Sequence, residues 1–290
     1  AAHEAGRRFV PFEFVRLLGH EEIEQVSLND HVAVELSVLF SDIRAHASLA
    51  AGTTAHGTFA LINEYLAYME PAIRHEGGFV DTFTGDGVMA LFEGSADRAV
   101  RSGVAQLAAL ERFNRARSDR GQASLRVGIG INTGELMLGV ISGGERLKPG
   151  VIGDAVNVAA RIETYTKHVG ASLLISEHTV AALDDPAAFT LRAIDRVRFK
   201  GKTQPLVVYE VLDGLPDAER ARKMATRGDL AAGRDELLAG RPEAALRLFA
   251  RGRATDPTDP VLAQHEALCQ RMVAAGVPPG WDGVTQLEGK

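Results

Sequence analysis

The order in which strand and helix patterns follow one another is the feature that most constrains the fold of this chain. From residue 34 onward the patterns are a buried strand, an amphipathic helix, two short strands joined by a turn, a second helix and a further strand. This order is typical of the split βαβ unit, an antiparallel sheet with helices packed against it. A doubly wound parallel sheet needs strands and helices that alternate singly, so it is the weaker interpretation. We therefore expect an α+β, ferredoxin-like fold.

Local patterns give the bounds of these elements. β-branched and aromatic side chains predict a strand over 34–40, and apolar spacings of three and four predict a helix over about 54–74. The remaining helices are expected at about 96–117 and 154–167. Turn signals at Gly85-Asp86-Gly87 and Asn132-Thr133-Gly134 predict two hairpins, which join 78–83 to 87–92 and 124–132 to 135–141.

The chain divides into three expected segments. Residues 1–30 hold a short amphipathic helix between Pro11 and Gly19, 31–214 form the α+β domain, and 215–290 are rich in Ala, Arg, Leu and Glu. Within the last segment, 240–249 resemble the second helix of a tetratricopeptide repeat. A solenoid needs about three repeats to bury its own faces. We therefore expect this small helical tail to dock on the domain as a cap.

Charge and composition exclude several classes of protein. The chain has 32 Lys and Arg against 38 Asp and Glu, a net charge of −6, which argues against a nucleic-acid partner. A single cysteine, Cys269, excludes a disulfide framework and fits a reducing compartment, so we expect a cytoplasmic location. The chain begins without methionine, so we expect a fragment. An upstream sensor domain would then belong to a parent protein that could be attached to a membrane.

Two aspartates are candidates for a metal site. Asp42 follows the first strand, and Asp86 lies in the turn that begins the third. The first and third strands of a split βαβ sheet are antiparallel neighbours, so the two carboxylates converge. Convergent carboxylates bind hard cations such as Mg²⁺ or Mn²⁺, usually with substrate phosphates completing the shell. On these two residues alone, ordinary turn chemistry is the simpler explanation.

Neighbouring segments make the pattern specific. The residues after Asp42 lead toward a helix, and backbone N–H groups at such a turn can hold phosphates. The later helix carries Asn157 and Arg161 four residues apart, on one face. Together with 80–92 and 126–135, these segments resemble the catalytic domain of class III adenylate/guanylate cyclases over about 33–213. The helix at 9–18 resembles the transducing element that precedes such domains.

The resemblance implies a role for each matching residue. Asp42 and Asp86, helped by the Ile43 carbonyl, would bind two Mg²⁺ or Mn²⁺ ions per active site. The other implied contacts to the nucleoside triphosphate are Asn157 at the ribose, Arg161 at the α-phosphate, Lys200 at the terminal phosphates, and Arg44, Ala45 and His46 in the loop after the first strand. In the family the metal ligands come from one subunit and the Asn, Arg and Lys from the other. The resemblance therefore also implies a homodimer.

The expected base pocket departs from the family. Thr82 stands where members that use ATP usually have lysine, and Gly150 stands at the partner position, which is usually Asp, Thr or Ser. Guanine-reading members tend to have an acid at the first position, which Thr82 is not. Ala45-His46-Ala47 replaces the common Gly-Phe-Thr, and His46 is interpreted as a packing substitute for the aromatic ring.

The sequence therefore predicts a lyase that converts a nucleoside triphosphate to its 3′,5′-cyclic monophosphate and pyrophosphate. ATP is favoured on family frequency alone, and GTP or a pyrimidine triphosphate stays open. A different class of function is a degenerate domain that binds nucleotide, or only dimerises, as a regulatory module. The presence of Asp42, Asp86, Asn157 and Arg161 argues against a degenerate domain, which has no chemical need for the full set.

Overall fold

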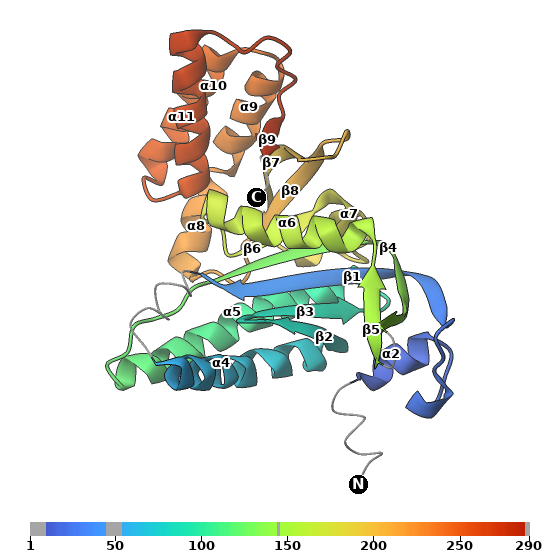
Figure 1. The fold of residues 1–290 in the computed structure, drawn as a ribbon. Helices are drawn as coiled ribbons and strands as arrows, with labels where there is room; N and C mark the ends of the chain where they lie inside the picture. The colour runs from blue at the N-terminus through green and yellow to red at the C-terminus, as the bar shows by residue number, and fades with distance from the viewer. Residues whose placement is uncertain (1–9, 45–53, 144–145, 288–290) are drawn as a thin grey trace.

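One mixed sheet forms the centre of the computed structural model, which describes residues 10–44, 54–143 and 146–287 (Figure 1). Its strands are β1 (His31–Ile43), β2 (Gly78–Thr84), β3 (Gly87–Phe92), β4 (Val127–Gly143), β5 (Arg146–Ile152), β6 (Leu173–Ser176), β7 (Leu191–Phe199), β8 (Leu206–Val211) and β9 (Thr285–Leu287). Their order in the sheet is β2-β3-β1-β4-β6-β8-β7-β9, and β5 pairs with β4 outside this path.

Strands β1 to β4 form the predicted split βαβ unit. β1 pairs antiparallel with β3 on one side and with β4 on the other, and β2 pairs antiparallel with β3. Beyond this unit the sheet is mixed, because β6 runs parallel to β4 and β9 runs parallel to β7. The expected α+β fold is thus confirmed, with two parallel pairs added to the antiparallel sheet.

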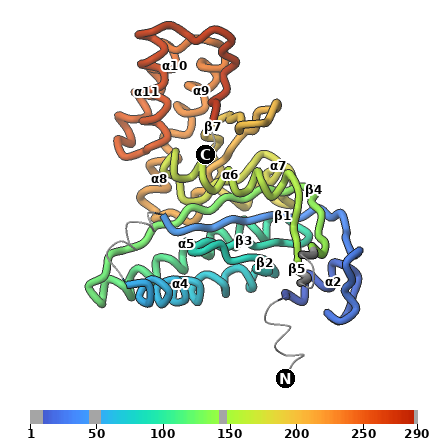
Figure 2. Tube along the Cα trace, in the orientation of Figure 1, coloured from blue at the N-terminus to red at the C-terminus, as the bar shows by residue number. Residues whose placement is uncertain are grey.

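The helices cover both faces of the sheet. They are α2 (Phe12–Leu17), α4 (Ala55–His75), α5 (Ala96–Asp119), α6 (Asp154–Val169), α7 (Glu177–Ala181), α8 (Asp217–Ala225), α9 (Arg227–Leu238), α10 (Pro242–Thr255) and α11 (Pro260–Ala275), with 3₁₀ turns at Ile23–Gln25 and Pro186–Ala188. α4 and α5 cover one face, and α6 lies on the other, between the sheet and the C-terminal helices (Figures 1 and 2). No helix in the described residues is long and apolar enough to cross a membrane.

The hairpin expected at Asn132-Thr133-Gly134 is wrong. These residues lie inside β4, where each pairs with a residue of β1 between 36 and 38. The Asn132 amide donates to the backbone oxygen of Ala155 at 3.0 Å, and Thr133 Oγ1 lies 2.8 Å from Ser37 Oγ. Side chains that often bend the backbone into a turn are satisfied here by neighbouring elements, so the strand continues through them.

Two glycines of β4 let α6 lie directly on the sheet. A Cβ atom on Gly130 would lie 2.1 Å from the backbone nitrogen of Glu163, and one on Gly128 would lie 2.1 Å from Oγ1 of Thr166. Both distances are far below van der Waals contact, so any side chain at these positions would push the helix away. Glycine in a strand commonly marks such a close approach.

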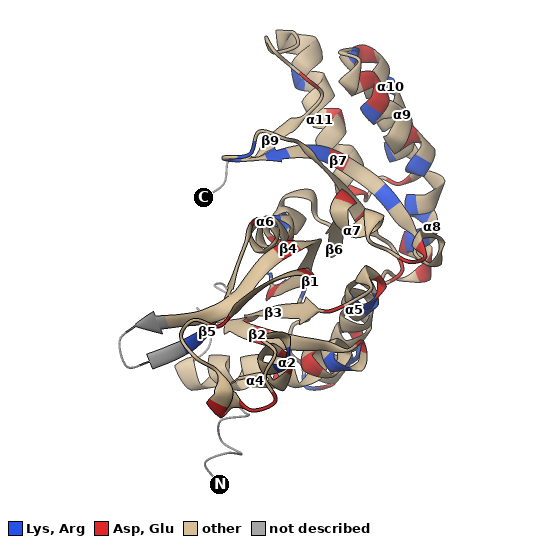
Figure 3. Ribbon diagram, turned by 90° about the vertical axis from the view of Figure 1, so that its right-hand side faces the viewer, with Lys and Arg blue, Asp and Glu red and all other residues tan. Residues whose placement is uncertain are grey.

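The C-terminal segment shares its hydrophobic core with the domain. Leu230, Phe249 and Leu262 of the helices α9, α10 and α11 pack in one buried cluster with Ile162 of α6 and Val208 of β8. Charges of both signs lie along α9 and α10 (Figure 3). The segment therefore packs on the sheet and α6 through an apolar face, while its resemblance to a tetratricopeptide repeat stays a prediction.

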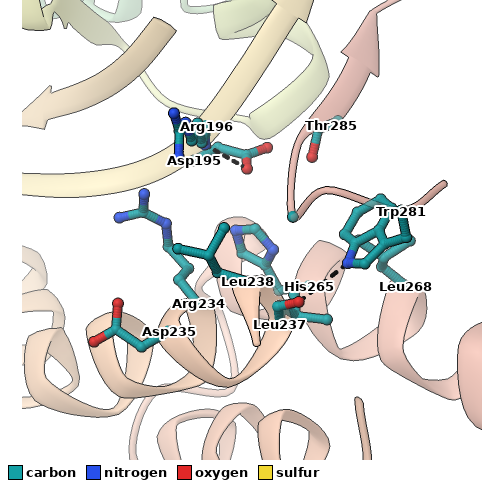
Figure 4. Close-up of a pocket in the computed structure, with 11 residues that line it drawn as sticks. Asp195, Arg196, Arg234, Asp235, Leu237, Leu238, His265, Leu268, Trp281 and Thr285 are labelled. Atoms are coloured by element: carbon teal, nitrogen blue, oxygen red, sulfur yellow. Dashed lines mark hydrogen bonds between the residues drawn. The ribbon is translucent and has the colours of Figure 1, made fainter. Parts of the chain in front are cut away.

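Residues that follow α11 complete this contact. β9 pairs with β7, and Trp281, just before β9, donates from Nε1 to the Leu237 carbonyl oxygen at 3.0 Å (Figure 4). On the other side of the same small cavity, Asp195 of β7 accepts a hydrogen bond of 2.7 Å from Tyr165 Oη. Tyr165 belongs to α6. Asp195 therefore contacts α6 through this hydrogen bond, and it also lines a cavity whose other walls come from the C-terminal segment.

A buried ion network also joins the C-terminal segment to the sheet. The fully buried guanidinium of Arg192 lies 2.6 Å from Glu210 and 2.6 Å from Asp259, and Lys223 Nζ lies 2.7 Å from the second Glu210 oxygen. Burial alone would raise the pKa of Asp259, but its hydrogen bond with Arg192 and the Arg192 charge outweigh burial and hold the pKa below its usual value. Each buried charge thus depends on its partners across the contact.

We expect Gly130→Ala to lower the free energy of unfolding by about 1–3 kcal/mol, because its Cβ displaces α6 from a packed core. Urea denaturation measures the difference. Gly228→Ala is the matched control, since a Cβ on this exposed glycine of α9 meets no atom within 4 Å. That change should be neutral or stabilising, because alanine favours the helix. A Gly130→Ala protein as stable as the wild type would contradict the close approach.

Arg192→Met should lower the free energy of unfolding by about 3–5 kcal/mol, because it leaves Glu210 and Asp259 as buried carboxylates without their guanidinium. Arg251→Met is the control, because Arg251 is exposed and pairs with Asp229 at the surface. Its cost should stay within about 1 kcal/mol. Equal costs for the two substitutions in the same denaturation experiment would show that burial of the network does not matter.

Candidate active site

The two candidate metal ligands lie side by side at the end of β1. Asp42 is the next-to-last residue of β1, and Asp86 lies in the β2–β3 turn, directly before Gly87. A Cβ atom on Gly87 would lie 3.3 Å from the Ser41 carbonyl oxygen and 3.4 Å from Asp42 Oδ1. The antiparallel pairing of β1 with β3 thus brings the turn that holds Asp86 against the Asp42 carboxylate.

The negative charges of Asp42 and Asp86 both raise the pKa values of neighbouring side chains. Burial raises the pKa of the Tyr65 hydroxyl, and the charges of Asp42 and Asp86 both add to this rise. Burial would lower the pKa of Lys167, but its hydrogen bond to Asp42 and the negative charges of Glu163, Asp42 and Asp86 outweigh burial and raise it. The site therefore attracts a cation.

Lys167 and Glu163 of α6 belong to the same site. Lys167 Nζ lies 3.1 Å from Asp42 Oδ2 and 3.8 Å from Glu163 Oε1. Burial, opposed by the Lys167 charge and reinforced by the Asp42 charge, raises the pKa of Glu163 to about 7. Sequence reasoning missed both residues. The available signal was their spacing of four on a predicted helix, where acid and base commonly pair.

The residues after Asp42 are placed only in part. Ile43 ends β1 with a buried side chain, and the Arg44 guanidinium donates to the backbone oxygens of Thr166, at 3.1 Å, and Ala171. Arg44 thus ties the end of β1 to the C-terminal end of α6. Ala45 and His46 lie outside the described residues.

A second group of candidates lies along the first half of α6. Arg161 Nη1 donates to the Lys200 carbonyl oxygen at 2.6 Å, and its guanidinium lies 5.9 Å from the centre of the Phe199 ring. Asn157 is exposed near the start of the same helix. Asn157 precedes Lys167, the contact of Asp42, by almost three turns, or about 15 Å along the axis. Within one subunit, Asn157 and the carboxylate group therefore lie toward opposite ends of α6, whereas Arg161 lies at the middle of the helix.

The expected base-reading residues lie on β2 and β5. Thr82 Oγ1 donates to Asp81 Oδ2 at 2.7 Å, and the β2–β3 register shifts between Val80 and Thr82, so Asp81 lies in a bulge. The pKa of Asp81 lies above its usual value. Burial raises it, and this effect outweighs the hydrogen bond with Thr82 and the positive charge of Lys148 on β5, which both lower it. Gly150 pairs with Gly139 of β4. Asp81 is a polar group of this region that sequence reasoning missed, although it is the neighbour of Thr82.

The donor atoms fit a hard divalent cation. Asp42 and Asp86 provide carboxylate oxygens, and Ile43 provides a backbone carbonyl at the end of β1. In the described part of the chain, no group of three or more His, Cys, Asp or Glu side chains gathers to hold a metal. Mg²⁺ commonly binds through one or two carboxylates and completes its shell with water and substrate phosphates. The Lys167 ammonium beside Asp42 shows that a positive charge is accommodated here.

The chain is similar in sequence to known adenylate cyclases. Residues 29–214 match the family described as the adenylate and guanylate cyclase catalytic domain. An adenylate cyclase of Anabaena cylindrica is 39% identical over 210 residues, which are 70% of this chain and 42% of that protein. The terminal-differentiation specific adenylate cyclase of Dictyostelium discoideum is 34% identical over 223 residues, which are 75% of this chain and 10% of that protein.

Solved structures agree with these relatives. The guanylyl cyclase Cya2 is 32% identical with a TM-score of 0.54, and the match covers 64% of this chain and 95% of that one. The adenylyl cyclase CyaB from P. aeruginosa is 28% identical with a TM-score of 0.56, covering 65% and 98%. The chain spans less than half the length of the two curated relatives, 42% and 10%. Since residues 29–214 match the family throughout, the chain belongs to the adenylate and guanylate cyclase catalytic domains.

Proposed function

We propose that the protein is a nucleotidyl cyclase that converts ATP to 3′,5′-cyclic AMP and pyrophosphate in the cytoplasm. The observation that carries this proposal is the convergence of Asp42 and Asp86 in a chain of this family. In the reaction the ribose 3′-oxygen loses its proton and bonds to the α-phosphorus. The bond from the α-phosphorus to the bridging oxygen breaks, and pyrophosphate leaves.

The carboxylate group serves the nucleophile and the triphosphate. Asp42, Asp86 and the Ile43 carbonyl would hold two Mg²⁺ or Mn²⁺ ions. Such ions, when bound, lower the pKa of the ribose hydroxyl and neutralise phosphate charge. Hydrogen bonds from Arg44 to the backbone oxygens of Thr166 and Ala171 hold the end of β1, which carries Asp42, against α6.

The Asn157 group serves the transferring phosphate. Asn157 would orient the ribose, Arg161 would stabilise charge on the α-phosphate, and Lys200 would hold the terminal phosphates. The hydrogen bond from Arg161 to the Lys200 backbone already keeps these two residues adjacent. Preorganised donors of this kind stabilise charge in the transition state without further rearrangement.

A homodimer would bring the two groups together. Within one subunit Asn157 lies about 15 Å along α6 from Lys167, the contact of Asp42, so a two-fold related partner can supply the missing half of each site. In such a dimer each interface contact occurs twice, and two complete sites form. We further propose that a signal from an upstream sensor enters through α2, whose Phe14 packs in a buried cluster with strands β1, β3 and β4.

The preference for ATP is supported by the two relatives named as adenylate cyclases. A guanylate cyclase is the second candidate, because the Asp81 carboxylate stands beside Thr82 and can accept hydrogen bonds from guanine. The test incubates the purified chain with each of the four nucleoside triphosphates and Mn²⁺, and detects pyrophosphate and cyclic products. Product from none of the four would favour a degenerate, regulatory domain.

Asp42→Asn and Asp86→Asn should each reduce turnover below detection, because each removes a charge that holds a metal ion. Neither change removes core packing, so the circular dichroism spectrum and melting temperature should stay close to those of the wild type. Asp119→Asn is the control, since it removes the same charge at an exposed position of α5. Wild-type turnover in Asp42→Asn or Asp86→Asn would refute the metal-ligand assignment.

Mixing two inactive variants should restore activity if the site is shared. Arg161→Ala alone should lower kcat by about 10²–10³, as the loss of one transition-state donor does. When it is mixed with Asp86→Asn, random exchange makes half of the dimers mixed, each with one intact site. About a quarter of wild-type activity should therefore return. Heterodimers that mass spectrometry detects but that stay inactive would show that each site lies within one chain.

A further inference from the structure

We propose that Lys167 occupies the metal site of the metal-free subunit, and that a divalent cation binding Asp42 displaces its ammonium group to Glu163. This inference rests on the proposed metal site, and it assigns two residues that neither the family resemblance nor the sequence pattern singled out. It makes Lys167 and Glu163 positioning residues that set how tightly the site binds a metal.

The first step is the contact between Lys167 and Asp42. Lys167 Nζ lies 3.1 Å from Asp42 Oδ2, within hydrogen-bond distance. Asp86 adds its negative charge at the same ammonium group. The ammonium therefore neutralises part of the charge that two adjacent carboxylates would otherwise direct at each other.

The second step is that Lys167 and a metal ion cannot share Asp42. Two positive charges about 4 Å apart repel strongly, even when water screens them in part. The Lys167 side chain is 45% exposed and can move, whereas α6 is held on β4 by its contact with Gly128 and Gly130. The charged end of the side chain, rather than the helix, is thus the part that moves. Lysine suits this role because its compact charge sits on a flexible four-carbon chain.

The third step is that Glu163, one turn before Lys167 on α6, provides a second acceptor for the ammonium group. Glu163 Oε1 lies 3.8 Å from Lys167 Nζ, is buried, and accepts no hydrogen bond from the described residues. From the described residues, its other oxygen accepts a long hydrogen bond of 3.4 Å, donated by Thr164. A buried acceptor without a donor costs free energy, and a full hydrogen bond from Lys167 would recover that cost. A small rotation of the lysine side chain moves the ammonium from Asp42 to Glu163.

The groups around Glu163 are compatible with movement of the Lys167 ammonium group from Asp42 to Glu163. Arg44, from the end of β1, acts on Glu163 with a positive charge; its Nη2 donates to backbone oxygens of 166 and 171, and its buried Nε donates to no acceptor in the described residues. Gly128 of β4 leaves the space in which Glu163 Oε1 lies, since a Cβ there would be 3.0 Å from that atom. Lys167, whose Nζ lies 3.8 Å from Glu163 Oε1, is a charged donor that can reach this oxygen with a change of its side chain alone.

The test measures Mn²⁺ binding to the full chain without nucleotide, by the loss of the free Mn²⁺ signal in electron paramagnetic resonance. We expect Lys167→Gln to tighten Mn²⁺ binding by about threefold to tenfold, since an ion pair that competes with the metal is removed. Lys167→Arg keeps the positive charge and should bind Mn²⁺ like the wild type. Arg115→Gln, which removes one positive charge from an exposed pair on α5, is the control and should change nothing.

A double-mutant cycle tests the second half of the proposal. At pH 8, above the pKa of about 7 for Glu163, Glu163→Gln should weaken Mn²⁺ binding because Lys167 loses the group that receives it. In the Lys167→Gln background the same change should have a smaller effect. If Glu163 acts only through its negative charge, the two effects are equal, and the proposed transfer is wrong.

The outcomes separate this inference from the proposed function. Wild-type protein with a saturable Mn²⁺ site that Lys167→Gln leaves unchanged or weakens would refute the inference and leave the function standing. Wild-type protein without such a site would contradict both. Melting temperatures of the variants, measured without metal, check that each remains folded. Because Lys167 is half exposed, these should stay close to the wild-type value.

Discussion

The direct packing of α6 on β4 is the contact on which the rest of the structure depends. Because Gly128 and Gly130 carry no side chain, the helix backbone touches the strand and has little freedom to slide. That one contact sets the positions of two chemical groups at once. It brings the C-terminal end of the helix, with Lys167, to Asp42, and it holds Arg161, at the middle of the helix, beside Lys200. A shift of the helix by one ångström would change both distances together.

The other side of α6 is held by the C-terminal segment. Ile162 packs among side chains of α9 to α11, and the Tyr165 hydroxyl donates a hydrogen bond to Asp195 of β7. The helix is therefore clamped between a strand and a second layer of helices. Two kinds of interaction hold the C-terminal segment against the sheet and α6. Apolar contacts tolerate small adjustments of position, whereas the buried ion network around Arg192 does not. The geometry of the candidate site is thus maintained by residues that never touch it.

Much of this arrangement could be predicted from the sequence, because its signals are local. Apolar periodicity gave the strand and helix order, and that order placed Asp42 beside Asp86. The hairpin at Asn132-Thr133-Gly134 failed because turn-forming side chains were satisfied by partners distant in sequence, such as Ser37 and Ala155. Contacts such as Arg192 with Asp259 and Lys167 with Asp42 join segments whose separation no periodic pattern encodes. The Asp81 bulge likewise follows from strand register rather than from composition.

The buried network has a consequence for where this domain ends. The family match ends at residue 214. Asp259, the ion-pair partner of Arg192, and Lys223, the partner of Glu210, both lie beyond that boundary. The family match is therefore shorter than the stretch of chain that shares this ion network and its hydrophobic core. A segment cut at the family boundary would carry a charged patch and an apolar surface that were built to face protein rather than water.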